Sequence, residues 1–316
     1  MKNYLSSLFI GSFLLLASAA SAQELDRSKA PEPGPAPEIN IEESKKFKLK
    51  NGLKVIVVEN HKLPRVSIQL SLDVDPIKEG ESAGYLDMVG TLLRKGSENY
   101  TKDEINEAID FIGATFSTSS SGFYASSLTK HQDKLMEVVS DVILNPAFPE
   151  EELEKARKET LSGLASAKVD PDAISGNVGR VLRYGKDHPY GEVTTEETVE
   201  NIKLEDIKTH YETFFKPTIG HLIIVGDINV KGAKKLAKKY FGDWKKDEVP
   251  TMEYDTPQPP EETKVALVNK PGAVQSVITI THPVQYKPGS EDYIPARVMN
   301  TLLGGGGFAG RLMQNI

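Results

Sequence analysis

The chain of 316 residues contains no cysteine. This absence excludes disulfide bonds, a thiolate nucleophile, a zinc site or iron–sulfur cluster with cysteine ligands, and a cysteine-linked lipid anchor. We therefore expect the folded protein to be stabilised by its core alone. With 39% hydrophobic residues, the chain is long enough for one domain of ordinary size and part of a second.

An excess of basic charge is also missing, since the net charge is -7 and the isoelectric point is about 5.5. A nucleic-acid surface requires a clustered basic face. Here lysine and arginine alternate with acidic residues along segments such as 151–160, which is typical of solvated helix faces. We predict no nucleic-acid partner.

A long apolar run occurs only at the start of the chain. Residues 1–22 combine Lys2, an apolar stretch from 8 to 20 and small residues before Ala22, which predicts a secretory signal peptide cleaved after Ala22. A membrane anchor is the alternative, but the stretch is shorter than the roughly 20 residues that cross a bilayer. We predict a periplasmic or secreted protein with no membrane attachment after cleavage, and a proline-rich linker over residues 23–44.

From residue 45 onward, the pattern predicts an α+β domain that extends to residue 250. Alternating residues around Asn51-Gly52 and around Gly122 favour two β-hairpins, and Arg65–Val74 reads as a further strand. Helices are expected over residues 101–112, 131–144, 149–168, from 171, 204–214 and 230–241, with a buried strand over 220–226. Hairpins followed by paired helices predict an antiparallel sheet covered by helices on one face.

The pattern restarts after a linker at residues 251–262. Residues 263–270 and 275–283 are strand-like, residues 294–303 helix-like, and four glycines follow from 304 to 307. We predict a tandem repeat of the first unit, with the second copy (residues 263–316) truncated.

Several stretches resemble, in this order, the pitrilysin/insulinase-type peptidases (inverted zincins), including the processing-peptidase branch. The stretches are LKNGLKVIVVEN, AGYLDMVGTLLRKGS, FPEEELEKARKE with VDPDA, DHPYG, FFKPTIGHLIIVGDI and LLGGGGFAGRL, which together extend over residues 46–316. The resemblance implies tandem α/β domains that face a second half, or a second subunit, across a peptide-holding cavity.

Active members carry H-x-x-E-H on the helix after the third strand, where residues at i, i+3 and i+4 share one face. The corresponding positions in this chain are Asp87, Gly90 and Thr91, and a later glutamate pair is replaced by Ser162 and Gly163. No histidine pair has ligand spacing elsewhere. We predict a degenerate motif with no catalytic residues, no metal site and no cofactor, zinc being expected only in a partner subunit.

Two segments are candidates for peptide binding. In active relatives a Phe-Asn-Ala-like strand pairs with the substrate, and Phe116, Ser117 and Thr118 occupy its place here. The run Gly304, Gly305, Gly306 and Gly307 resembles a glycine-rich segment that is linked to substrate recognition in the family. An ordinary edge strand and a plain turn are the respective alternatives.

The leading hypothesis is a zinc-less, non-catalytic subunit that completes a peptide-holding cavity with a zinc-bearing partner of the same family. A stand-alone peptide-binding or structural protein is the second hypothesis. An active metalloendopeptidase with a rearranged site is the third. The family's Arg and Tyr that contact substrate would follow Gly310-Arg311-Leu312, beyond the given sequence.

Overall fold

A computed structural model describes residues 34–35, 43–284 and 286–315. The chain divides into two units, residues 1–42 and 43–316. The predicted signal peptide and nearly all of the linker after it lie outside the described residues.

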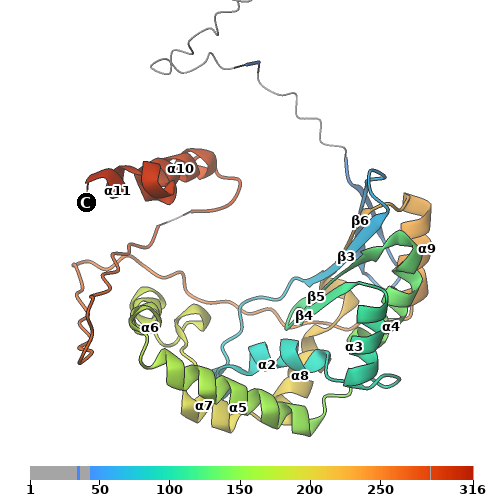
Figure 1. The fold of residues 1–316 in the computed structure, drawn as a ribbon, viewed down its shortest axis with the longest axis horizontal. Helices are drawn as coiled ribbons and strands as arrows, with labels where there is room; N and C mark the ends of the chain where they lie inside the picture. The colour runs from blue at the N-terminus through green and yellow to red at the C-terminus, as the bar shows by residue number, and fades with distance from the viewer. Residues whose placement is uncertain (1–33, 36–42, 285, 316) are drawn as a thin grey trace, which may run out of the picture. The chain divides into compact units, whose positions relative to one another are not determined.

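A six-stranded sheet organises residues 43–254, which we call the sheet domain (Figure 1). Its strands are β1 (Lys45–Lys48), β2 (Lys54–Glu59), β3 (Arg65–Leu72), β4 (Thr115–Ser119), β5 (Gly122–Leu128) and β6 (Gly220–Gly226). They lie in the order β1-β2-β6-β3-β5-β4, so that β1 and β4 are the edge strands.

The prediction of a wholly antiparallel sheet was wrong, because β6 runs parallel to β2. All other neighbours are antiparallel. β6 enters between β2 and β3, which follow each other in sequence. Local alternation finds a strand, but it does not reveal that a strand from about 160 residues later separates two sequence neighbours.

Ten α-helices accompany the sheet in the described part of the chain. They are α2 (Tyr85–Leu93), α3 (Lys102–Phe111), α4 (Gln132–Leu144), α5 (Glu150–Ala167), α6 (Pro171–Tyr184), α7 (Glu196–Asn201), α8 (Leu204–Phe214), α9 (Val230–Phe241), α10 (Tyr293–Asn300) and α11 (Arg311–Asn315). Thr101 and Glu104 form a capping box at the start of α3, each side chain bonding the other residue's main-chain N–H. The Asp170 side chain caps α6.

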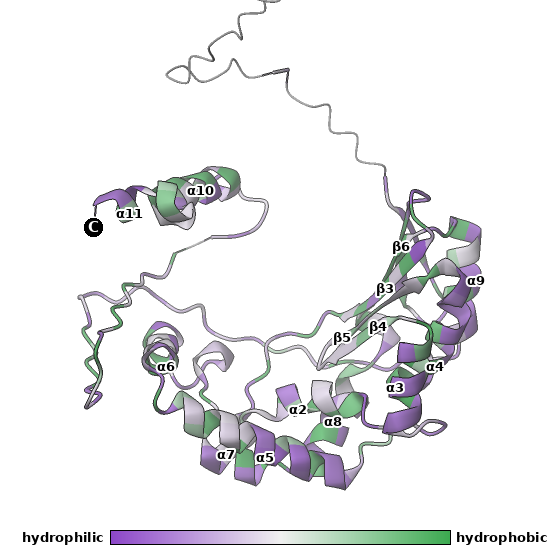
Figure 2. Cartoon of the chain, in the orientation of Figure 1, coloured by the Kyte–Doolittle hydropathy of each residue, from purple (hydrophilic) through white to green (hydrophobic). Residues whose placement is uncertain are grey.

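One face of the sheet is buried and the other is partly exposed. Along β3, Val66, Ile68 and Leu70 are buried, while the intervening Ser67 and Gln69 are not. Figure 1 shows α3, α4 and α9 on one side of the strands, and Figure 2 shows both hydrophilic and hydrophobic residues on each of these helices. The strands therefore bury their apolar side chains under helices on one face, as predicted.

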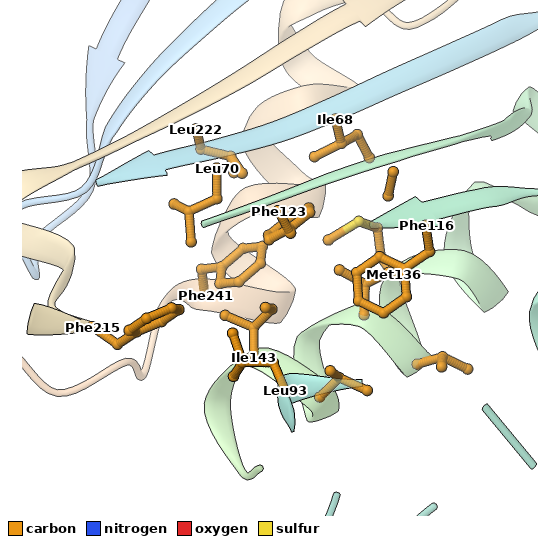
Figure 3. Packing of buried hydrophobic residues seen from close by; sticks show 14 of the residues in the cluster. Ile68, Leu70, Leu93, Phe116, Phe123, Met136, Ile143, Phe215, Leu222 and Phe241 are labelled. Carbon is orange, nitrogen blue, oxygen red and sulfur yellow. The ribbon is translucent and has the colours of Figure 1, made fainter. Parts of the chain in front are cut away.

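Aromatic rings occupy the centre of this core (Figure 3). Phe123 of β5 stacks on Phe241 of α9 with ring centroids 6.2 Å apart, and meets Phe116 of β4 edge-to-face at the same distance. Leu93 places α2 against the same cluster. The core thus fixes α2 and β4 relative to each other.

The second half of the fold prediction is not confirmed. No strand occurs in the described residues between 263 and 292, where two were predicted. A strand exists only where its main chain pairs with a neighbour, and the described residues offer none there. The predicted helix over 294–303 is present as α10, which passes into a π-helical turn at Thr301–Gly305.

Within the described residues, no helix has the length and apolar character required to cross a bilayer.

Candidate functional site

Helix α2 carries the three degenerate motif positions and begins without a capping side chain. Gly84 precedes it with a φ of 109°, a conformation that glycine adopts readily. The Glu79 carboxylate instead accepts hydrogen bonds from the main-chain N–H groups of Gly84 and Leu86, both at 2.9 Å. Burial raises the pKa of Glu79. A carboxylate at the positive end of the helix therefore sets the direction of α2.

Two of the three motif positions lie off the face that α2 buries in the core. Met88, Val89, Leu92 and Leu93 are buried, whereas Asp87 and Thr91 are exposed. The Thr91 hydroxyl donates to the Asp87 main-chain carbonyl at 3.0 Å. These buried residues hold the helix in place with Asp87 and Thr91 on its outer side.

Gly90 is buried against the turn between β4 and β5. A Cβ atom at Gly90 would lie 2.9 Å from Ser119 Cα, 3.1 Å from Ser119 C and 3.2 Å from Ser120 N. The Gly90 carbonyl also accepts a hydrogen bond from Thr118 Oγ1 at 2.6 Å. The helix backbone therefore rests directly on the hairpin backbone, and a glutamate at this position requires the hairpin to move.

The donor set at the motif positions does not fit zinc. It offers one carboxylate, one hydroxyl already used by the main chain, and a glycine, whereas a catalytic zinc takes three protein ligands. Ser162 and Gly163 lie exposed on α5. The described residues hold no group of three or more His, Cys, Asp or Glu side chains arranged for a metal ion.

A cavity of about 460 Å³ lies between α2, α3 and β4. It brings together Asp87, Gly90 and Thr91 with two of the candidate peptide-binding residues, Ser117 and Thr118. The full lining is Leu86, Asp87, Gly90, Thr91, Arg94, Lys95, Lys102, Asn106, Ser117, Thr118, Ser119 and Ser120. Two motifs that are separated in sequence therefore form one site beside an edge strand.

Phe116 and the glycine run do not line this cavity. The Phe116 side chain is 4% exposed and belongs to the core, so that only its main chain is positioned to meet a peptide. Gly304–Gly307 extend from the π-helical turn after α10 into a short 3₁₀ helix at Gly307–Ala309, and all four residues are exposed.

The sequence analysis missed three cations that line the cavity, namely Arg94, Lys95 and Lys102. Lys95 and Lys102 approach the Glu152 carboxylate at 3.5 and 3.1 Å, and Lys155, from outside the cavity, approaches it at 2.6 Å. The Glu152 side chain is only 5% exposed, and the Lys155 and Lys102 ammonium groups lower the pKa of Glu152 to about 2. The adjacent basic residues Arg94 and Lys95 are visible in the sequence after the apolar residues of α2, but no local pattern predicts that they lie beside Lys102.

Arg94 differs from the two lysines. Its guanidinium lies over the Phe116 ring, 5.3 Å from the centroid, and its Nε is buried with no hydrogen-bond partner in the described part of the chain. Burial lowers the pKa of Arg94, which nevertheless stays charged because arginine is not deprotonated in proteins.

His210 supports the cavity from α8. Its Nε2 donates to the Ser120 main-chain carbonyl at 2.9 Å, and its ring packs against Tyr85 and Phe214. Burial lowers the pKa of His210. The imidazole is therefore neutral and fixes the β4–β5 turn, a role that spacing alone did not indicate.

Comparison with known proteins places these features in a family. The sequence model of "Insulinase (Peptidase family M16)" matches residues 54–178, and that of "Peptidase M16 inactive domain" matches residues 201–316. The second match begins inside the sheet domain, ahead of β6.

Individual relatives agree with these matches. The "Non-peptidase homolog YmxG" of Helicobacter pylori is 23% identical over all of this chain and 68% of its own length. A Pseudomonas fluorescens structure titled as a peptidase M16 inactive domain has a TM-score of 0.71 and 21% identity, covering 86% of this chain and 67% of that one. The periplasmic protease PqqL of Escherichia coli has a TM-score of 0.58 and 16% identity, covering 69% of this chain and 26% of that one.

The chain spans between about half and two thirds of the curated relatives that it matches first. The two matched models leave out little of the chain beyond its first 53 residues. The chain belongs to the insulinase family, peptidase family M16.

Proposed function

We propose that this chain is a non-catalytic M16 subunit that holds an extended peptide in a cavity completed by a zinc-bearing partner of the same family. The contact between Gly90 and the β4–β5 turn carries this proposal. It preserves the packing of α2 on the sheet and leaves no room for a base at the central motif position. The relative named a non-peptidase homologue supports the same reading.

The peptide-holding part of the proposal rests on β4. This strand is at the edge of the sheet and borders the cavity through Ser117, Thr118 and Ser119. An edge strand leaves main-chain N–H and C=O groups unpaired, and an extended peptide pairs with them as an added strand. The asparagine that active relatives use at this strand is absent, so we assign peptide binding mainly to the main chain.

A cleavage assay tests the non-catalytic assignment. The purified protein is incubated with fluorogenic peptides alone, and then with a zinc-bearing M16 protein from the same organism. We expect no metal-dependent cleavage alone and a rate with the partner above that of the partner by itself. Strong zinc-dependent cleavage by the isolated protein would refute the assignment.

Restoring the motif tests the steric argument. The variant combining Asp87→His, Gly90→Glu, Thr91→His and Gly163→Glu supplies the family's ligand types. We expect no zinc-dependent cleavage, because a glutamate side chain introduced at position 90 has no space beside Ser119. Recovery of cleavage in a folded variant would show that the β4–β5 hairpin can move to accommodate the new side chain at little cost in stability.

A stand-alone peptide-binding protein is the second candidate. It is favoured by the fact that the cavity and edge strand β4 are formed entirely within the sheet domain. Gel filtration of the native complex discriminates, since a stable assembly with a zinc-bearing relative contradicts this candidate.

Location and domain limits complete the proposal. We propose signal-peptide cleavage after Ala22 and a periplasmic or secreted site of action, in keeping with the periplasmic protease among the structural neighbours. We also retain the limits 45–250 and 263–316 for the two predicted domains.

A further inference from the structure

The cavity beside α2 is positively charged, although the chain as a whole carries a net charge of -7. Arg94, Lys95 and Lys102 line it, against the single carboxylate of Asp87. A recess whose walls carry charge of one sign concentrates groups of the opposite sign. The cavity is therefore suited to an anionic group rather than to a metal ion.

The three cations differ in whether they form ion pairs with a carboxylate. Lys95 and Lys102 share the Glu152 carboxylate with Lys155. No carboxylate in the described residues forms an ion pair with Arg94, whose Nε is buried and unbonded. Asp110 interacts with Arg94 through its charge alone, without an ion pair between the two side chains. Because Arg94 lines the cavity and its guanidinium lacks a carboxylate partner in the described part of the chain, a ligand carboxylate can form charge-assisted bonds with it.

The position of Arg94 over Phe116 connects this cation to the edge strand. Side chains directly opposite each other on neighbouring strands point to the same face of a sheet. A peptide residue paired opposite Phe116 would thus place its side chain on the helix side of the sheet, where the Arg94 guanidinium lies. Asn106 lines the same cavity and adds a neutral hydrogen-bonding group.

We propose that Arg94 binds a carboxylate of an extended peptide whose main chain pairs with β4, so that this site selects acidic peptides. The assignment rests on the proposed peptide-holding function and adds a substrate class to it. An aspartate or glutamate side chain is the expected source of the carboxylate. A peptide C-terminus offers the same chemistry.

Four labelled ten-residue peptides test this assignment by fluorescence polarisation with the full chain. They share a Thr/Val-rich sequence and carry Glu, Gln or Lys at one central position with both ends blocked, or Gln with a free C-terminal carboxylate. We expect the Glu peptide to bind at least about tenfold more tightly than the Gln peptide, as for one charge-assisted hydrogen-bonded pair, and the Lys peptide to bind most weakly. Tighter binding of the free-end peptide would reassign the carboxylate to the C-terminus.

Arg94→Gln should remove the preference for Glu, so that the Glu and Gln peptides bind with equal affinity. Arg183→Gln is the matched control, because Arg183 also lies beside an aromatic ring (5.9 Å from the Tyr184 centroid) but outside the cavity. Circular dichroism verifies folding. In the wild-type protein, the Arg94 Nε–H resonance should shift with the Glu peptide and not with the Gln peptide, which tests the contact without any substitution.

The outcomes distinguish a failure of the carboxylate assignment from a failure of the proposed peptide-holding function. Equal binding of the Glu and Gln peptides, or an Arg94 variant that keeps the preference, overturns the carboxylate assignment and leaves peptide holding intact. Failure of all four peptides to bind overturns both.

Discussion

Residues 43–254 bury most of their apolar side chains in one core, whereas the C-terminal segment (the described residues between 263 and 315) leaves most of its apolar side chains exposed. Figure 2 shows hydrophobic residues on α10, none of which is buried. Both regions contain alternating apolar residues. The difference is that strands such as β3 have two hydrogen-bonded neighbours, while the C-terminal segment has none in the described chain. Alternating apolar residues therefore favour a strand, but the strand forms only where its main chain pairs with a neighbouring strand.

The largest contrast between the two regions is expected from one pair of isoleucines. Ile68 on β3 is fully buried and Ile280 in the C-terminal segment is 94% exposed. We expect Ile68→Ala to lower the free energy of unfolding by about 2–5 kcal/mol, because it removes buried contacts and leaves a cavity. Ile280→Ala should change it by less than about 0.5 kcal/mol. Urea unfolding followed by circular dichroism measures both, and equal losses would indicate that the segment is packed in solution.

A smaller contrast is expected between two glycines in helices. An added methyl group at Gly90 meets the Ser119 backbone, whereas at Gly163 it meets nothing within 4 Å. Gly90→Ala should cost about 1–3 kcal/mol through overpacking. Gly163→Ala should stabilise the protein by about 0.5–1 kcal/mol, because alanine favours the helix. A Gly90→Ala variant as stable as the wild type would contradict the packing argument at the centre of the proposed function.

Acid should loosen the sheet domain in two steps. The pKa of His210 is lower in the folded protein than in the unfolded chain, so the unfolded chain binds a proton more readily. The contribution of neutral His210 to the free energy of unfolding is therefore complete above pH 6.5 and is lost as pH falls below that value. The pKa of Glu152, lowered to about 2, gives a contribution that is complete above pH 4.5 and is lost between pH 4.5 and 2.

Unfolding midpoints measured from pH 8 to pH 3 test both steps. His210→Gln keeps an amide donor for the Ser120 carbonyl and should abolish the upper step alone. Glu152→Gln should reduce the lower step without removing it, because burial of Asp141 is outweighed by hydrogen bonds from Ser97 and Asn99, which lower the pKa of Asp141 as well. If the upper step persists without His210, another group controls it.

The smallest effect concerns one capping side chain. Thr101→Ala should lower the free energy of unfolding by about 1 kcal/mol, because its hydroxyl accepts from the Glu104 N–H at the start of α3. Thr209→Ala, at an exposed position within α8, is a control outside the caps and should cost less. Comparable losses for both would argue against a special role for the capping box.

Local signals predicted much of the fold. The bounds of α8, β6 and α9 agree with the predicted ranges because each has a clear apolar period and a clean stop. The short helix α7 was missed, although Thr195 and Thr198 cap it. The parallel pairing of β2 with β6 and the absence of strands in the described residues after 263 depend on distant partners, which periodicity does not encode.

The sequence predicted which metal-binding residues are missing from the site, but not the contacts that the fold creates there. Missing ligands at Asp87, Gly90 and Thr91 follow directly from the motif spacing. The steric contact at Gly90 and the unpaired Arg94 arise only when α2 packs on β4. Such contacts join residues some 20 to 30 positions apart and have no signature in either segment alone.

The seating of the β4–β5 turn on the backbone of α2 also limits which residues position 90 accepts. Any side chain there must displace the hairpin, so a variant that acquires one loses stability before it can gain a new activity. The glycine therefore ties the sequence of α2 to the shape of the neighbouring hairpin.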